Sequence, residues 1–514
     1  MADSVQTAIA AVCQPDARFQ APEQAQEASR LIHQAGACAL CVLRFIQIPL
    51  GPVYLAESKD ILHALGIEDS TGQPCPACLG VLRQEHVSKV VERFRQEGFD
   101  SLSVGIGIEL PRSVWVRHRA MLVACGLGQT ASVVDIKDVF KLHAAQLLGS
   151  EYSPTSDTLI EVSFSHPETA TEHQFLVRQA EPPRGRFRGK PKGGQFKKDS
   201  RAAIVAELAS LDDTAFRQQF SCPPPPVTAW AEVDGVGFKR ASLFIGGRYL
   251  KLERNISQTP FIVEGRRMAE HSVAEIIGEP IQQLARCDSY NLVGSGREDA
   301  DVRMLGDGRP FYLECINPRT TRIQQADIHQ VETRLCESNS PVQVRRLQII
   351  KPEDTAVIKE GEEQKSKHYC ALVWIARPLD AGQLEEINRR GQEGFVLQQK
   401  TPVRVLHRRA PLTRPKRILG LKIEHIEDSF YRLRMESEAG AYIKEFVHGD
   451  LGRTTPSLAS MVNATCDILE LDDEDMRTAR EPEILAAQGW QERLSAKDSG
   501  PPSLGVDQHE GSAQ

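Results

Sequence analysis

Two cysteine pairs with the same spacing constrain the fold of this chain more than any other sequence feature. Cys38 and Cys41 form one Cys-x-x-Cys pair, and Cys75 and Cys78 form the other. Two thiolates three residues apart can bind one ion from a tight turn, and two such turns complete a tetrahedral site. We therefore expect these cysteines to hold a zinc ion. A site with four sulfur ligands has no open position, so the zinc is expected to be structural.

The second pair also matches half of the zinc-deaminase signature, because Pro74 precedes Cys75. That signature needs a His-x-Glu triplet before the cysteines. His425-Ile426-Glu427 lies far downstream, in the wrong order, which excludes a deaminase. The other eight of the 12 cysteines are scattered, and we expect buried residues or surface thiols rather than a disulfide framework.

The 514 residues of the chain predict roughly three domains. No apolar run approaches the roughly 18 residues needed to cross a bilayer, and the first residues lack the layout of a signal peptide. We expect an intracellular protein without a membrane partner. Residence in the nucleus, the cytoplasm or both stays open, since the basic loop at 184–201 fits a localisation signal, an RNA contact or a solvated surface.

Charge is segregated along the chain although the net charge is −7. The segment 184–201 has eight basic residues and one acid, and the segment 401–422 has seven basic residues and no acid. Such runs can bind phosphates locally, although for either run alone a solvated surface is the simpler explanation. In the second run, the expected RNA contacts are Arg404, Arg408, Arg409, Arg414, Lys416 and Arg417.

The pattern of elements predicts an α+β protein with a mainly antiparallel sheet in its C-terminal part. We expect a helical, cysteine-rich part over 1–150, an α/β RNA-binding module over 151–250, an α+β domain over 251–475 and a polar, disordered tail over 476–514. Turn signals and apolar alternation give the expected elements: helices at 85–96, 202–220, 268–277 and 458–469, strands at 159–164, 229–233 and 442–447, and hairpins around Asp307-Gly308 and Glu427-Asp428.

Three side chains have the chemistry of a nucleoside site. Asp299 lies in a glycine-flanked loop, and Tyr442 and Lys444 share one face if 442–447 is a strand. A carboxylate can attack an anomeric carbon, an aromatic ring can stack on a base, and a lysine can pair with the carboxylate. The simpler alternative is that Asp299 belongs to a run of solvated acids.

Two motifs resemble those of the pseudouridine synthases. Gly296-Arg297-Glu298-Asp299 resembles their Gly-Arg-x-Asp motif, and the segment EAGAYIKEFVHGDLGR is similar to the Gly-x-Tyr-Ile-Arg/Lys motif of the bacterial T-loop synthase TruB. Together with SGREDADVRMLGDGRPF and RNISQTPF, these segments resemble the archaeal and eukaryotic Pus ten family (tRNA pseudouridine 54/55 synthase). The resemblance covers roughly residues 245–472.

The resemblance implies an isomerase with a pseudouridine synthase fold that converts uridine to pseudouridine in the T-loop of tRNA, at position 54, position 55 or both. It implies that Asp299 is the catalytic carboxylate and that Lys444 pairs with it. It implies that Tyr442 packs on the uracil and that Arg297 helps hold the extruded base or the vacated stack. It also implies an accessory domain over 1–150 with structural zinc on the four cysteines, a THUMP-like module over 151–250 and a catalytic domain over 251–475. No organic cofactor is expected. We expect a monomer that binds tRNA and, as a further possibility, other structured RNAs.

Two other functions are considered. An RNA-binding scaffold with little or no catalysis would keep the same fold and basic surfaces. A THUMP-linked methyltransferase or thiolase would need a nucleotide-binding loop. The runs Gly126-Leu127-Gly128 and Gly235-Val236-Gly237 both lack the third glycine of such a loop, which argues against this class.

Overall fold

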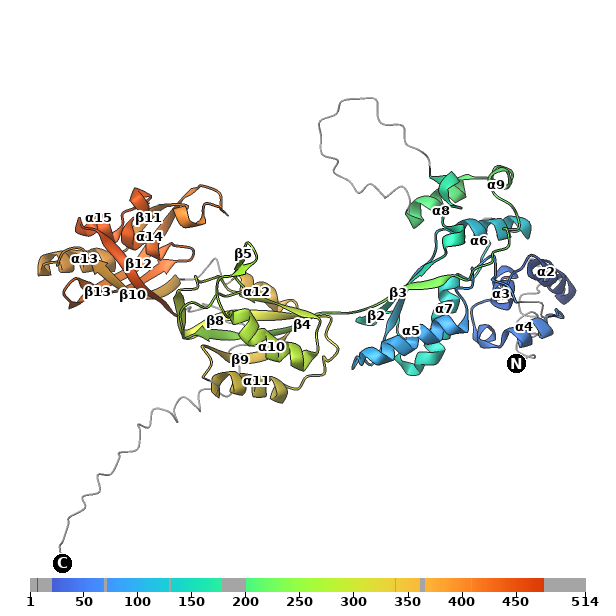
Figure 1. The fold of residues 1–514 in the computed structure, drawn as a ribbon, viewed down its shortest axis with the longest axis horizontal. Coiled ribbons are helices and arrows are strands. Elements are labelled where there is room, and N and C mark those ends of the chain that lie inside the picture. Colours follow the sequence, from blue (N-terminus) through green and yellow to red (C-terminus); the bar gives the residue numbers. More distant parts are fainter. Residues whose placement is uncertain are drawn as a thin grey trace, which may run out of the picture. The chain divides into compact units, whose positions relative to one another are not determined.

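The computed structural model describes residues 7, 21–68, 72–128, 131–177, 200–337, 339–360, 366–407 and 409–475. The chain divides into two compact units, Met1–Ala241 with Arg319–Thr321, and Ser242–Pro318 with Arg322–Gln514 (Figure 1). The tail expected over 476–514 and most of the basic loop lie outside the described residues. Among the described helices, none combines the length and the apolar character that a membrane span requires.

The first unit has a three-stranded sheet surrounded by helices. Strand β1 (Gly105–Glu109) pairs in parallel with β2 (Thr158–Ser165), and β2 pairs antiparallel with β3 (Glu232–Arg240). The described helices are α2 (Pro22–Gln34), α3 (Ala39–Phe45), η1 (Pro52–Leu55), α4 (Ser58–Ala64), α5 (Gln84–Glu97), α6 (Ser113–Ala124), α7 (Ile136–Leu148), η2 (Gly149–Glu151), η3 (Pro167–Thr169), η4 (Gln174–Leu176), α8 (Arg201–Ser210) and α9 (Asp213–Gln219). Hydrophobic residues from before and after residue 150 share one core.

Two expectations for this unit need correction. The single helix expected over 202–220 is two helices, because the side chain of Asp212 accepts a hydrogen bond from the Ala215 amide at 2.7 Å and starts α9 anew. The strand expected over 229–233 begins only at Glu232, since the amides of Thr228 and Ala229 donate to the Glu168 carboxylate instead of to a neighbouring strand. Helix α5 and strand β2 confirm the predictions at 85–96 and 159–164.

The second unit is built on a ten-stranded sheet. Its order is β14-β11-β12-β13-β10-β15-β8-β4-β9, with β7 paired to β8. The strands are β4 (Leu243–Lys251), β7 (Ser289–Gly294), β8 (Val302–Ile316), β9 (Val342–Ile350), β10 (Ser366–Ile375), β11 (Phe395–Lys400), β12 (Thr413–Glu427), β13 (Phe430–Glu438), β14 (Thr454–Thr455) and β15 (Cys466–Asp475). Only β15 and β8 pair in parallel among these described strands. The prediction of an α+β fold with a mainly antiparallel sheet is confirmed.

Helices and short turns complete the second unit. They are α10 (Val273–Ala285), α11 (Gln325–Glu337), α12 (Asp354–Glu360), α13 (Ala381–Glu393), η5 (Val403–Val405), α14 (Ile443–His448), η6 (Asp450–Gly452) and α15 (Leu458–Val462), together with the small hairpin β5 (Ile262–Val263) and β6 (Arg266–Arg267). One hydrophobic core joins α10 and α11 to β4, β8 and β9, and a second joins α13, α14 and α15 to β10–β13. Strand β15 lies between β10 and β8 and so connects the two parts of the sheet.

The prediction of a hairpin at Asp307-Gly308 is wrong, because both flanking segments pair with the same neighbouring strand, β4. Arg309 lies opposite Tyr249, and Met304 lies opposite Lys251, so residues 305–308 bulge out of one continuous strand. The side chain of Arg248 holds the bulge by donating to the carbonyl oxygens of Asp307 and Gly308.

Three further expectations for the second unit are settled by local structure. The segment expected as a strand at 442–447 is helix α14, since Ile443, Phe446 and Val447 are all buried at helical spacing. The helix expected at 458–469 ends at Val462, and β15 follows from Cys466. The helix expected at 268–277 starts at Val273. The hairpin around Glu427-Asp428 is confirmed by the pairing of β12 with β13.

Candidate functional site

Asp299 lies in the loop that connects β7 to β8, which we call the Asp299 loop (residues 295–301). The main chain of this loop is tied to the sheet at its start, where the Ser295 amide donates to the Pro310 carbonyl at 2.8 Å. The Asp299 carbonyl accepts from the Val302 amide at 3.1 Å, where β8 begins. The Asp299 side chain remains 36% exposed, so its carboxylate is accessible to a ligand.

A pocket of about 220 Å³ lies beside this loop. Asp299, Tyr442, Lys444 and Arg297 all line it, so the structure brings the four predicted catalytic residues together. The other lining residues are Gly296, Glu298, Val302, Arg309, Lys367, Tyr369, Arg404, Val405, Arg409, Gly440, Ala441, Ile443, Leu471 and Asp473. An acid, a phenol and several cations therefore face one small cavity.

The Asp299 carboxylate has two cationic neighbours. Nη1 of Arg404 lies 2.9 Å from Oδ2 of Asp299, and Nζ of Lys444 lies 3.5 Å from the same oxygen. The Arg404 guanidinium also pairs through Nε with Oε1 of the buried Glu445 at 2.8 Å. Arg404 was expected to contact RNA, and in the structure it is the nearer partner of Asp299.

Lys444 is shared between two acids. Its Nζ lies 2.6 Å from Oδ2 of Asp301, closer than its distance to Asp299. Partial burial of Asp301 favours its neutral form, but the hydrogen bonds from Lys444 outweigh this and lower the pKa of Asp301 below its ordinary value. Asp301 therefore belongs to the charged group around the pocket.

Tyr442 is fixed at the position just before helix α14. Its amide donates to Oε1 of the buried Gln399 at 2.9 Å, and Nε2 of Gln399 donates back to the Tyr442 carbonyl at 2.9 Å. The phenol oxygen accepts a hydrogen bond from Nη1 of Arg409 at 3.2 Å. The two-sided contact with Gln399 fixes the main chain from which the ring extends into the pocket.

A buried polar network under the pocket was not predicted from the sequence. Oε2 of Glu298 lies 2.8 Å from Nε of Arg309, and the Tyr249 phenol donates to the same carboxylate at 2.8 Å. Nη2 of Arg309 lies 3.1 Å from Oδ2 of Asp473 on β15. The sequence signal for this network is faint: Arg309 directly precedes the apolar segment 310–313 of β8.

The predicted RNA-contacting residues fall into two groups. Arg404 and Arg409 line the pocket. Arg414, Lys416 and Arg417 lie on β12, where Arg414 and Arg417 are exposed and the Lys416 ammonium donates to the Ala439 carbonyl. Arg408 lies outside the described residues.

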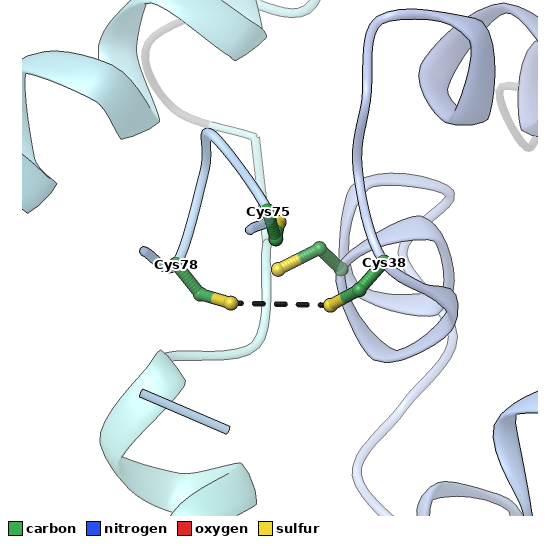
Figure 2. A group of neighbouring side chains, drawn as sticks. Cys38, Cys75 and Cys78 are labelled. Atoms are coloured by element: carbon green, nitrogen blue, oxygen red, sulfur yellow. Dashed lines mark hydrogen bonds between the residues drawn. The ribbon is translucent and has the colours of Figure 1, made fainter. Parts of the chain in front are cut away.

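The four cysteines form a second candidate site, in the first unit. Figure 2 shows Cys38 approaching Cys75 and Cys78 from the opposite side of the cluster, and the sulfur atoms of Cys38 and Cys78 are 3.9 Å apart. All four sulfur atoms, including that of Cys41, lie within 4.8 Å of one another. Tetrahedral coordination with Zn–S bonds of about 2.3 Å places sulfur atoms about 3.8 Å apart. The cluster therefore fits a bound metal ion.

A buried arginine lies against the cysteine cluster. Nη1 of Arg44 donates to the sulfur of Cys41 at 3.4 Å, and Nε donates to the Val134 carbonyl at 2.6 Å. Burial alone would lower the pKa of Arg44, but the charge of the nearby thiolate of Cys41 raises the pKa overall. A buried cation beside the sulfurs suits thiolate ligands.

Comparison with known proteins places the chain in a family. The profile "Pus10, C-terminal" matches residues 244–476, and "Eukaryotic Pus10, N-terminal" matches residues 75–236. The tRNA pseudouridine synthase Pus10 of Mus musculus is 33% identical over 522 residues, which span 88% of this chain and 97% of that protein. The chain belongs to the Pus10 family. The Homo sapiens Pus10 is 35% identical over 418 residues, covering 78% of each chain.

An archaeal relative matches a smaller part of this chain than the vertebrate relatives do. The archaeal Pus10 of Korarchaeum cryptofilum is 36% identical over 250 residues, which cover 46% of this chain and 66% of that protein. The C-terminal Pus10 profile includes the whole Asp299 pocket, whereas the N-terminal profile begins at Cys75. A solved Cbf5–Nop10–Gar1 complex matches 46% of this chain and 50% of that chain at 15% identity, with a TM-score of 0.26, a likeness too slight to bear on the fold.

Proposed function

We propose that this chain is a tRNA pseudouridine synthase that isomerises uridine at position 54, position 55 or both in the T-loop, with Asp299 as its catalytic carboxylate. The observation that carries the proposal is that Asp299 and Tyr442 line one pocket. The names of the Pus10 relatives supply the substrate class.

The chemistry needs a uridine that has left the base stack, because the reacting sugar carbon is otherwise inaccessible; the flip costs a few kcal/mol. Tyr442 packs against the everted uracil, and Arg297 at the rim of the pocket holds it there. Arg404 and Lys444 hold the carboxylate of Asp299 by ion pairs.

Asp299 then assists cleavage of the bond between C1′ and N1. The base turns within the pocket, and C5 bonds to C1′. The proton on C5 is lost, with Tyr442 taking part in that deprotonation, and N1, released from C1′, takes up a proton. The bonds that break and form stay within one nucleotide, so the reaction requires no organic cofactor.

RNA binding would rest on phosphate contacts from Arg409 and from the exposed basic residues of β12. Counterion release makes such binding weaken steeply with salt. The contact of Arg408 with RNA stays a prediction. A THUMP-like role for 151–250, a monomeric state and residence in the nucleus or the cytoplasm also stay predictions.

We also propose that the bound ion at the cysteine cluster is zinc with a structural role. Tetrahedral sites with four sulfur ligands bind either zinc or an iron–sulfur cluster. The ion would tie Cys38 and Cys41 at the start of α3 to the turn that carries Cys75 and Cys78. The buried Arg44 would offset part of the negative charge of the thiolates.

The decisive experiment compares Asp299→Asn with the wild type in a tritium-release assay on tRNA labelled at uridine C5. We expect no product above a few per cent of normal, with tRNA binding nearly intact. Asp307→Asn, an exposed acid on the β8 bulge, is the matched control and should keep full activity. Activity in Asp299→Asn would refute the assignment, and a wild type that binds tRNA without forming product would favour the RNA-binding scaffold. Mapping pseudouridine in tRNA from cells that lack the gene would identify the position.

A further inference from the structure

The Asp299 loop rests on a lysine that takes no part in the chemistry proposed above. Lys251 is the last residue of β4, and its side chain is fully buried. Its ammonium donates hydrogen bonds to the main-chain oxygens of Ile256 at 2.8 Å, Asp299 at 3.0 Å and Ala300 at 3.2 Å. An ammonium has three donors, and each of them has a carbonyl partner.

The burial of this ammonium needs an explanation. Removing an ammonium from water costs several kcal/mol, and the nearest carboxylate oxygen, Oε1 of Glu298, is 4.0 Å from Nζ. An apolar side chain of similar length would fill the same volume at lower cost. What only the lysine supplies is a set of directional hydrogen bonds to the loop.

These bonds act at the residue that matters for the proposed reaction. The carbonyls of Asp299 and Ala300 follow directly after the Asp299 side chain, so fixing them fixes the main-chain angles from which the carboxylate extends. On the other side, Nη1 of Arg309 donates to the Ser295 carbonyl at 2.8 Å, and Nε2 of Gln258 donates to the Gly296 carbonyl at 3.0 Å. The loop is therefore held before and after Asp299.

Among the described residues, the ion-pair partners of the Asp299 carboxylate are side chains that remain partly exposed to solvent. Its partners are Arg404, which is 39% exposed, and Lys444, whose Nζ is nearer to Asp301. An arriving RNA phosphate competes for such cations. The main chain held by Lys251 is the part of the arrangement that an entering substrate does not reach.

We propose that Lys251 is a positioning residue, which sets the direction of the Asp299 carboxylate by fixing the main-chain oxygens of Asp299 and Ala300; this inference rests on the catalytic role proposed for Asp299. A misplacement of about 1 Å at a reacting group can reduce a rate about a hundredfold. Lys251 therefore contributes to turnover without touching the substrate.

The test measures kcat and KM for tRNA in Lys251→Met, which keeps an unbranched side chain one atom shorter than lysine and removes the donors. We expect kcat to fall about tenfold to a hundredfold, with KM changed less than about threefold. Lys251→Arg keeps charge and donors and should recover part of kcat. The matched control is Lys137→Met in the first unit, where a lysine that donates to the Ile108 carbonyl is lost and kcat should stay at the wild-type value.

Each other outcome overturns a specific statement. If Lys251 only stabilised the fold, Lys251→Met would lower Tm and the folded fraction but leave kcat per folded molecule unchanged. That result would overturn the positioning role. If Lys251→Met does not fold, Lys251→Gln carries the same expectation, and a wild-type kcat there overturns it. Activity in Asp299→Asn instead removes the proposed function itself, so the two failures are distinguishable.

Discussion

Lys444 forms its shorter ion pair with Asp301, at 2.6 Å, and not with Asp299. The resemblance to pseudouridine synthases implied that Lys444 pairs with Asp299. The geometry instead gives Asp299 a second cation, Arg404, whose Nη1 lies 2.9 Å from the carboxylate. The expected single pair of Asp299 with Lys444 is thus part of a group of four charged side chains that also includes Asp301 and Arg404.

Because Lys444 lies between Asp299 and Asp301, we expect the effects of substituting Asp301 and Arg404 on kcat/KM to depend on each other. Arg404→Gln removes the nearer partner of Asp299, and we expect kcat/KM to fall about tenfold, as for loss of a charged hydrogen bond of about 1.4 kcal/mol. In the Asp301→Asn background, Lys444 is free to turn to Asp299, so the same change should be less damaging. A double-mutant cycle on kcat/KM measures the coupling. Strictly additive effects would show that Lys444 does not substitute for Arg404.

Loss of one cysteine ligand should empty the metal site. We expect Cys75→Ser to reduce bound zinc to near zero and to lower the Tm of the first unit, because binding energy at a structural site is also folding energy. Elemental analysis and thermal unfolding check both statements. Cys125→Ser is the control, since Cys125 is a partly buried cysteine of the same unit that lies outside the cluster. Wild-type protein without zinc would contradict the metal assignment and leave the Asp299 site unaffected.

The bulge in β8 predicts a position at which only glycine fits. Gly308 has a φ of +80°, and a Cβ atom there would lie 2.6 Å from the Tyr249 carbonyl oxygen. Gly308→Ala should therefore lower the free energy of unfolding by more than the roughly 1–3 kcal/mol of the backbone strain alone. Gly265→Ala isolates that strain, because Gly265 has a φ of +78° and an added Cβ would meet nothing within 4 Å. Equal losses in chemical denaturation would rule out the close contact.

Lys251 predicts a pH dependence of stability in the alkaline range. Burial, reinforced by the positive charge of Arg309 and only partly offset by Glu298 and Asp301, lowers the pKa of Lys251 from 10.5 to about 8. The unfolded chain then binds more protons than the folded chain between these two values, so the free energy of unfolding rises with pH in that window.

The gain from this one group approaches about 3 kcal/mol across the window. Other groups also titrate there, so the quantity to measure is the difference between wild type and Lys251→Met, by denaturant unfolding at pH 8 and pH 10. The wild type should gain stability relative to the variant as pH rises. A difference that does not change with pH would mean that the Lys251 pKa is not depressed.

Short sequence patterns predicted those features of the molecule that depend on residues close together in the chain. The equal spacing of the cysteine pairs predicted the cluster, and the apolar period of 85–96 predicted α5. The glycine-flanked loop and the motif around Asp299 predicted one wall of the pocket. Each of these signals lies within a few residues of the feature that it indicates.

The misses have a common physical origin in pairing between distant segments. Asp307-Gly308 has the composition of a hairpin turn, but β4 pairs with the chain on both sides of it and makes a bulge instead. The alternation at 442–447 suggests a strand, but the core buries Ile443, Phe446 and Val447 together, which requires a helix. The network of Glu298, Arg309 and Asp473 joins residues far apart in the chain, and no local pattern indicates such partners.

The central place of β15 in the sheet has a consequence for how the protein is made. On the ribosome, β8 and β10 are synthesised before Cys466–Asp475, and among the described strands it is β15 that lies between them in the sheet. Until it emerges, β10 and the first residues of β8 (302–304) have an open strand edge, which is a template for association with other chains. A nascent chain stalled before Cys466 would also lack Leu471 and Asp473 of the pocket. The two parts of the sheet can therefore be joined through β15 only after this ten-residue segment has been made.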